Sequence, residues 1–318
     1  MRYVVYGAGA VGGVVGGTLA RSGHAVTLVA RGVHLAAIRD HGLTLDAGDG
    51  RHRIHAPATD TAAEVDWTDD TIVLLAVKSH QAAAALSDLR AHAPADVPVV
   101  CLTNGIATEA AALRLFARTY AVCVMLPASH LEPGVVVASC HPTPAILDVG
   151  RFPGGTDATT AAVAADLRAS RIESEERADI MATKRRKLVM NLGNGVDASF
   201  AQGDAADELA ELAQAEGERV LAAAGLAVVS VEEDRERRGS ILQRRPDLER
   251  RGGSTWQSLS RGTGDSEIDY LAGEVVLQGR LHGVPTPVND AVVAATRHLA
   301  ATGGTPRSLD AAAVLARL

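Results

Sequence analysis

A lysine and two asparagines in the second half of the chain recur at the spacing of helical turns. Lys187 and Asn191 are four residues apart, so they share a helical face, and Asn194 follows about one turn later. An ammonium group and two amides on one face could hold a carbonyl oxygen and donate a proton to it. The spacing leaves a second interpretation open, in which residues 184–187 (KRRK) form a solvated basic turn.

A glycine-rich segment follows a run of β-branched residues at the N-terminus. It reads GAGAVG and matches the pattern G-x-G-x-x-G. In this pattern the first glycine permits a tight turn, the second lets backbone approach a pyrophosphate, and the third lets helix and strand pack closely. The segment therefore predicts a dinucleotide-binding loop with the pyrophosphate at a helix N-terminus. The alternative is a glycine-rich turn that binds nothing. The candidate residues are Gly7, Ala8, Gly9, Ala10, Val11 and Gly12.

The end of the second predicted strand decides which dinucleotide this loop would take. NAD-binding proteins usually place Asp or Glu there, where it binds the ribose 2′-hydroxyl. This chain has Arg31 instead, and no acidic residue occurs between Gly13 and Arg39. An arginine can pair with a 2′-phosphate through two N–H groups, so NADP(H) is the predicted cofactor. A surface arginine that caps the strand is the alternative.

Lys78 and Asn104 follow two further predicted strands, at the carboxyl edge where α/β sheets bind ligands. Lys78 could contact a cofactor phosphate or ribose, although an exposed lysine at a helix start fits equally well. Asn104 could hydrogen-bond the nicotinamide ribose or a substrate, although Asn-Gly is also an ordinary turn pair. Both residues are therefore candidate binding residues.

These residues require strands that end at one edge of a sheet. In the first half of the chain, β-rich runs alternate with Ala-rich helical patterns, which predicts βαβ units around a parallel sheet. Residues 134–150 alternate differently and contain Gly and Pro, so they predict an antiparallel extension. The predicted strands are 2–6, 25–30, 71–77, 98–102 and 120–125, and the predicted helices 10–21, 33–40, 79–91 and 106–118.

Strand signals become sparse beyond residue 176, where Ala/Leu-rich patterns take over. The fold class is therefore α/β, with an N-terminal Rossmann-type domain over 1–175 and a mostly helical substrate domain over 176–318. Residues 178–198 read as a helix broken near its two glycines, Gly193 and Gly195. The charged stretch 232–254 predicts a mobile loop with solvated helix ends.

Composition and charge narrow the function classes. The formal charge of −7 argues against binding nucleic acid through a general field, because phosphate binding needs clustered Lys and Arg. The three cysteines lack C-x-x-C spacing, so neither a disulfide framework nor a metal site is predicted. Without a signal-peptide pattern or a bilayer-spanning apolar run, we expect a soluble, cytoplasmic protein. Its length of 318 residues suffices for two domains.

Motifs in both halves resemble those of ketopantoate reductases in the same order. They comprise GAGAVG at 7–12, R-G-x-H-L at 31–35, V-K-x-x-Q at 77–81, N-G at 104–105, R-K-L-x-x-N at 186–191 and S-E-I-D-Y-L at 266–271. The resemblance implies an NADPH-dependent oxidoreductase of pantothenate biosynthesis that reduces a 2-oxo acid, 2-dehydropantoate (ketopantoate), to the 2-hydroxy acid pantoate. A homodimer is possible.

The resemblance also assigns roles on the substrate side. It implies that Lys187 is the catalytic lysine, that Asn191 and Asn104 bind substrate or cofactor, and that Glu267 binds substrate hydroxyls. It points to Ser254 as a ligand of the substrate carboxylate, with Thr255 as the alternative. Asn194 joins the predicted substrate-binding residues. For Glu267 a second interpretation is open, since a carboxylate in a helix's first turn stabilises the helix dipole.

Three positions depart from the family pattern. Thr103 stands where the family often has glutamine, Asn194 lies one position short of the usual second-asparagine spacing, and Trp256 adds bulk to the predicted substrate loop. All three fall on the substrate side. Two alternatives are therefore kept: a reductase of another oxo acid or imine on the same scaffold, and a non-catalytic NADP(H)-sensing protein.

Overall fold

The computed structural model describes residues 1–249, 252–262 and 266–318, and the chain forms two compact units. The first unit comprises Met1–Thr103, Thr108–Met181 and Glu232–Leu248. The second comprises Asn104–Ala107, Ala182–Val231 and Glu249–Leu318. A single boundary at residue 176 does not describe this division, because the chain crosses between the units repeatedly.

A seven-stranded sheet forms the centre of the first unit among the described residues. Its strand order is β11-β8-β7-β6-β1-β2-β5, and every neighbouring pair is parallel except β11 and β8. The chain proceeds from β1 to β2 on one side and from β6 to β7 on the other, so the order reverses between β1 and β6. This is the switch point at which Rossmann-type sheets bind ligands. The strands are β1 (Arg2–Tyr6), β2 (Ala25–Val29), β5 (Ala58–Thr59), β6 (Thr71–Leu75), β7 (Val99–Cys101), β8 (Thr119–Met125) and β11 (Ile146–Arg151).

A second, four-stranded sheet lies in the same unit, and the sequence analysis missed most of it. Its order is β4 (Gly50–Ile54), β3 (Leu43–Ala47), β10 (Val135–Ala138) and β9 (Ala128–Ser129). The antiparallel extension expected over 134–150 is therefore divided. Only β11 extends the large sheet in antiparallel fashion, while β10 pairs in parallel with β3.

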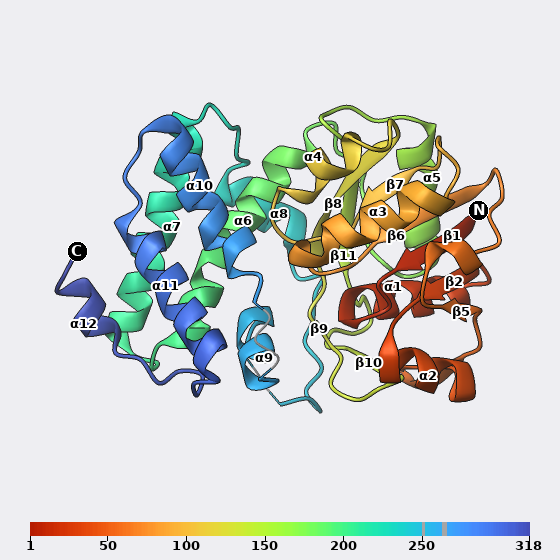
Figure 1. Cartoon of the computed structure of the whole chain (residues 1–318), viewed down its shortest axis with the longest axis horizontal. Coiled ribbons are helices and arrows are strands. Elements are labelled where there is room, and N and C mark those ends of the chain that lie inside the picture. The colour runs from red at the N-terminus through yellow and green to blue at the C-terminus, as the bar shows by residue number, and fades with distance from the viewer. Residues whose placement is uncertain (250–251, 263–265) are drawn as a thin grey trace. The chain divides into compact units, whose positions relative to one another are not determined.

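Helix α1 (Ala10–Arg21) packs against strands of both sheets. Figure 1 shows α1 beside β1 and β2. Two adjacent glycines of this helix face different sheets, since a Cβ on Gly16 would lie 2.9 Å from Val5 Cγ2 and one on Gly17 would lie 3.5 Å from the Leu45 side chain. Because these positions lack side chains, the helix backbone can approach both sheets closely.

The remaining helices of the first unit are no longer than α1. The helix expected over 106–118 is confined to α4 (Thr108–Leu113). Helix α5 begins with a capping box, in which the Asp157 carboxylate accepts the Thr160 N–H and the Thr160 hydroxyl accepts the Asp157 N–H. The other helical elements are α2 (Gly32–His41), η1 (Ala62–Glu64), η2 (Ser79–Gln81), α3 (Ala82–His92) and α5 (Ala158–Ala169).

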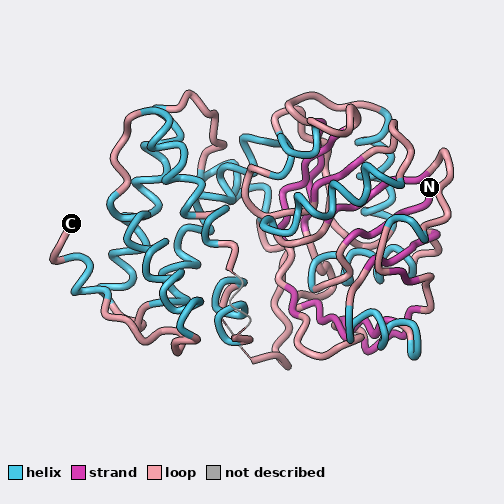
Figure 2. The backbone as a smooth tube through the Cα atoms, in the orientation of Figure 1, coloured by secondary structure: helices cyan, strands magenta, loops and turns pink. Residues whose placement is uncertain are grey.

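The second unit is helical, and all the named strands belong to the first (Figure 2). Its core is built by α7, α10 and α11, which pack on one another around Leu209, Val275 and Val292. No helix of the described residues is long and apolar enough to cross a membrane. The elements are α6 (Ile180–Ser199, whose first two residues belong to the first unit), α7 (Asp204–Ala223), α9 (Ser254–Ser260), η3 (Ile268–Tyr270), α10 (Ala272–His282), α11 (Pro287–Thr302) and α12 (Ala311–Leu315).

The predicted break in the helix at Gly193 and Gly195 is wrong, because α6 runs unbroken from Ile180 to Ser199. A Cβ at Gly195 would lie 2.7 Å from Val292 Cγ1 and 2.8 Å from Ile268 Cδ1. The glycine is therefore a point of close packing for α11 and η3. Because α6 continues through it, Asn194 stays in register with Lys187 and Asn191.

The charged stretch expected to form a mobile loop instead packs on the first unit over Glu232–Leu248, which we call the returning segment. It contains most of α8 (Val231–Arg238), whose Arg237 donates two hydrogen bonds to the Asp148 carboxylate at 2.6 and 2.9 Å. Further along, Arg245 Nη1 donates to Asp46 Oδ1 at 2.8 Å and its backbone N–H donates to the Ser139 carbonyl. Ion pairs with residues distant in sequence thus hold this segment in place.

Candidate active site

The glycine-rich loop joins β1 to α1 at the switch point of the large sheet. Gly7 has φ +105°, and a Cβ there would lie 2.9 Å from the Ala76 carbonyl. A Cβ at Gly12 would lie 2.1 Å from the Gly7 carbonyl oxygen. Both glycines are therefore required for the chain after β6 and the start of α1 to approach β1.

Gly9 differs from these two glycines, because a Cβ at this position would meet no described atom within 4 Å. It is the N-cap of α1, and no side chain among the described residues caps this helix end. The first turn of α1 also carries no acidic residue. Backbone N–H groups and the positive end of the helix dipole thus border open space, which fits the pyrophosphate of a dinucleotide.

Arg31 lies directly beyond β2 as the exposed N-cap of α2. Its guanidinium interacts with the hydroxyl of Tyr6, the last residue of β1, and that hydroxyl donates to Asp88 Oδ2 at 2.6 Å. Burial raises the pKa of Tyr6 to about 12, the hydrogen bond to Asp88 adds to the rise, and Arg31 opposes it. Sequence reasoning missed Tyr6 and Asp88, since α3 supplies the aspartate from far along the chain.

Two other predicted cofactor residues, Lys78 and Asn104, follow neighbouring strands of the large sheet but belong to different units. Lys78 is half-buried and is the N-cap of η2, two residues beyond the Ala76 carbonyl that contacts the glycine loop. Asn104 follows β7 and belongs to the second unit. Its neighbour Gly105 has φ +75° and would place a Cβ 2.6 Å from the Tyr270 carbonyl oxygen. Gly105 thus brings residue 104 next to η3.

The predicted substrate residues all belong to the second unit, in four of its segments. Asn194 Nδ2 donates to Asn191 Oδ1 at 3.3 Å, and Asn191 is buried. Lys187 is half-buried one turn earlier on α6. A Cβ at Gly253 would lie 3.1 Å from Asn194 Oδ1, so the N-terminus of α9 approaches the two asparagines.

Glu267 precedes Ile268, the first residue of η3, which packs on α6 next to Asn194. Ile268 packs against Gly195, the residue after Asn194, and Glu267 itself is buried as the N-cap of η3. Because the η3 carbonyl of Tyr270 also contacts Gly105, this short helix lies between α6 and the segment that carries Asn104. The segments that carry the lysine, the three amides and the carboxylate therefore belong to one unit.

The structure separates the two candidates for the carboxylate ligand. Thr255 is 2% exposed and its Oγ1 has no hydrogen-bond partner among the described residues, so it is enclosed by the packing of α9. Ser254 is half-buried at the start of the same helix, where it approaches Asn194 through Gly253. Exposure therefore favours Ser254 as the residue that meets a ligand.

Trp256, predicted to add bulk to the substrate loop, lies in α9 beside the helical core. Its ring packs against the small apolar cluster of Ala198, Leu259 and Leu299, and the Arg307 guanidinium lies 5.6 Å from the ring centroid. Such stacking of a cation on an aromatic face is stabilising. The tryptophan thus belongs to the packing of α9 on the helical core.

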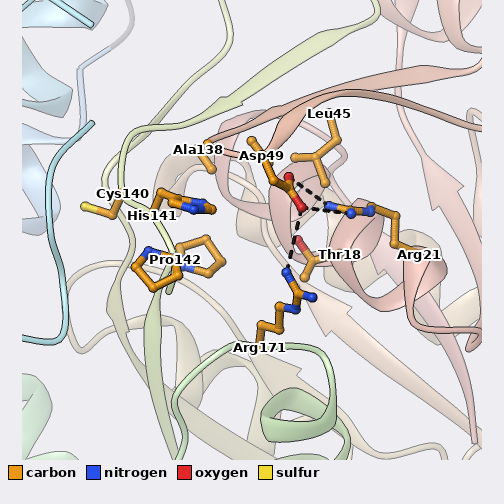
Figure 3. A pocket seen from close by; sticks show the side chains of 12 residues that line it. Thr18, Arg21, Leu45, Asp49, Ala138, Cys140, His141, Pro142 and Arg171 are labelled. Carbon is orange, nitrogen blue, oxygen red and sulfur yellow. Dashed lines mark hydrogen bonds and ion pairs between the residues drawn. The ribbon is translucent and has the colours of Figure 1, made fainter. Parts of the chain in front are cut away.

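The pocket in Figure 3 is separate from the glycine loop, because its residues Thr18 and Arg21 belong to the opposite end of α1. Arg21 Nη2 lies 3.0 Å from Asp49 Oδ2, and Arg171 Nη1 lies 3.7 Å from the same oxygen. The hydrogen bond from Arg21, joined by one from His52, holds the pKa of Asp49 well below its usual range despite partial burial. This cluster of charges links α1 to the β3–β4 turn.

The sequence matches known proteins over nearly its whole length. The family described as ketopantoate reductase PanE/ApbA matches residues 3–154, and its C-terminal family matches residues 179–300. A 2-dehydropantoate 2-reductase of Halobacterium salinarum is 31% identical over 302 residues, which cover 91% of this chain and 95% of the relative. The corresponding protein of Pyrococcus horikoshii is 26% identical, with 96% of this chain and 99% of the relative covered.

Solved structures agree with these matches. A PanE/ApbA family ketopantoate reductase from Ralstonia eutropha has a TM-score of 0.81 at 26% identity and covers 95% of this chain and 99% of that chain. A D-mandelate dehydrogenase shares the fold with a TM-score of 0.82 at 24% identity, over 96% of this chain and 100% of that chain. The chain therefore belongs to the ketopantoate reductase family, whose members are oxidoreductases that use a nicotinamide cofactor.

Proposed function

We propose that the protein uses NADPH to reduce a 2-oxo acid to a 2-hydroxy acid, and that the substrate is 2-dehydropantoate. The observation that carries the proposal is the hydrogen-bonded Asn191–Asn194 pair on α6, one turn after Lys187, with the residue after Glu267 packed against Gly195. The names of the full-length relatives support the substrate. We infer that the glycine-rich loop and Arg31 bind the cofactor and that polar residues of the second unit bind the substrate.

The first unit fits the cofactor. The Gly7–Gly12 loop and the α1 N-terminus would hold the pyrophosphate, and Arg31 would pair with the 2′-phosphate. Lys78 and Asn104 would contact the cofactor from the ends of β6 and β7. When bound, the nicotinamide supplies a hydride to the carbonyl carbon.

The second unit supplies the acid and the oriented polar groups. Lys187 would stabilise the negative charge that develops on the carbonyl oxygen and donate a proton to it. Asn191 Oδ1 accepts from Asn194, so the Asn191 amide N–H groups remain to donate to a substrate oxygen. Ser254 would bind the carboxylate and Glu267 the distal hydroxyl.

A substrate panel tests this function. The purified protein should oxidise NADPH with 2-dehydropantoate at a higher kcat/KM than with other 2-oxo acids or cyclic imines. A faster reaction with another member of the panel would refute the proposed substrate and keep the reductase. Tight NADPH binding without oxidation by any carbonyl compound would instead indicate an NADP(H)-sensing protein.

The cofactor preference gives a second prediction. Replacing Arg31 by alanine should raise the KM for NADPH about 10- to 100-fold, since a charge-assisted hydrogen bond to phosphate contributes roughly 1.5–3 kcal/mol. The KM for NADH should stay within about twofold, because NADH has no 2′-phosphate for the arginine to bind. Steady-state kinetics with both cofactors measure the difference. Arg39→Ala, later on the same helix, is the matched control, and equal effects of the two substitutions would refute the role of Arg31.

A further inference from the structure

A buried histidine connects the glycine-rich loop to a distant turn. His34 lies in the first turn of α2, three residues after Arg31, and is 9% exposed. Its Nε2 lies 2.8 Å from the Ala8 carbonyl oxygen, and its Nδ1 accepts the Gly134 N–H at 2.8 Å. Since a carbonyl only accepts and an amide N–H only donates, the ring must be neutral with its proton on Nε2.

We propose that His34 is a positioning residue that sets the glycine-rich loop for cofactor binding. The peptide unit between Ala8 and Gly9 is planar, and its N–H points opposite to its C=O. Holding the Ala8 carbonyl on the His34 ring therefore fixes the direction of the Gly9 N–H, at the position that borders open space. The inference rests on the proposed dinucleotide site and assigns this site a residue outside the glycine pattern.

His34 also links the two halves of that site. It lies in α2, whose N-cap is Arg31. One helix thus carries both the proposed ligand of the 2′-phosphate and the residue that holds the pyrophosphate loop. The third partner, Gly134, precedes β10 of the second sheet and has φ +77°. Through one ring, the loop after β1 is held by α2 and by the turn before β10.

Protonation would break this arrangement. A proton on Nδ1 would turn this acceptor into a donor that points at another donor, the Gly134 N–H. It would also place a positive charge in a buried site. The titratable group that packs on the ring among the described residues is His130, at 4.1 Å between centroids, and the glycine loop contributes only the Ala8 carbonyl. Burial lowers the pKa of His34 from its ordinary 6.5, the Ala8 contact opposes this, and His130 adds to the lowering. The neutral, binding-competent ring therefore persists at neutral pH, and it is lost only when the pH falls below this lowered pKa.

Two substitutions separate the two hydrogen bonds. His34→Gln keeps an N–H donor near the position of Nε2, whereas His34→Asn keeps an acceptor near Nδ1 but is too short to reach Ala8. By calorimetric titration at pH 7.5, His34→Asn should weaken NADPH binding about 10- to 100-fold, the range expected for an unpaired buried carbonyl, and His34→Gln should restore most of it. His41→Asn, an exposed histidine on the same helix, is the matched control.

A second readout uses the cofactor-free protein. The Gly134 amide should exchange its hydrogen faster in His34→Gln than in the wild type, because the glutamine offers no acceptor at the position of Nδ1. Unchanged NADPH affinity in His34→Asn overturns the proposal. If this variant fails to fold, a folded His34→Gln that binds NADPH about 10- to 100-fold more weakly than the wild type overturns it instead. If the wild type binds no NADPH at all while its Gly134 amide is protected, it is the proposed cofactor that is refuted, and the positioning role falls with it.

Discussion

Replacing Lys187 by alanine is expected to lower kcat by about 10²- to 10⁴-fold, the usual contribution of a positioned general acid. The Kd for NADPH should stay within about twofold, because the glycine loop and Arg31 belong to the other unit. The side chain shares a face of α6 with the Asn191–Asn194 pair, so its loss removes the proton donor but leaves the amides in place. Single-turnover kinetics with calorimetric NADPH binding measure both quantities.

Two further variants make the result specific. Lys187→Arg keeps the positive charge but holds its proton too tightly to donate, so it should recover binding of the 2-oxo acid and little of kcat. Arg185→Ala removes a nearby cation of α6 that bonds the Ala227 carbonyl, and it should leave kcat nearly unchanged. Near-wild-type turnover of Lys187→Ala with normal NADPH binding would show that the proton comes from elsewhere.

Removing Arg237 should cost the fold about 3–5 kcal/mol, as is typical when one partner of a buried ion pair is deleted. The Asp148 side chain is 3% exposed and accepts two hydrogen bonds from this guanidinium at 2.6 and 2.9 Å. In Arg237→Ala, the Asp148 carboxylate would keep the hydrogen bond from the Glu175 N–H and the ion pair with Arg177 Nε at 3.6 Å. The loss of stability should therefore lie at the lower end of this range. Urea unfolding followed by circular dichroism measures the loss.

The control for this prediction lies on the same helix. Arg235 is exposed on α8, and Arg235→Ala should change the free energy of unfolding by less than about 0.5 kcal/mol. Adding Asp148→Asn to Arg237→Ala should recover part of the loss, because the uncompensated carboxylate is then removed. Equal stability of the Arg235 and Arg237 variants would mean that the buried pair contributes nothing.

The sequence predicted the elements whose signals are local. The five predicted strands correspond to β1, β2, β6, β7 and β8, and the glycine pattern runs from the end of β1 into the first turn of α1 as predicted. The alternation of Leu43–Ala47 and the two-residue Gly48-Asp49 turn carried a hairpin signal that could have revealed β3 and β4. The charged residues of β4 obscured it.

What could not be predicted depends on partners far apart in the chain. Arg237 and Asp148 are 89 residues apart, and Arg245 and Asp46 are 199 apart, so the returning segment resembles a solvated loop when only its own residues are considered. The same holds for Tyr6 and Asp88 beside Arg31. At Gly195 a local rule failed, since packing against Val292 outweighs the low helix propensity of glycine.

The returning segment also determines how the two units can be exchanged between relatives. A chimaera joined near residue 176 would take residues 1–175 from one parent and Glu232–Leu248 from the other. Asp46 and Asp148 would then meet a foreign segment in place of the arginines that bind them. An exchange that keeps residues 232–248 with the first unit preserves both ion pairs, so three stretches of the chain must be inherited together as one module.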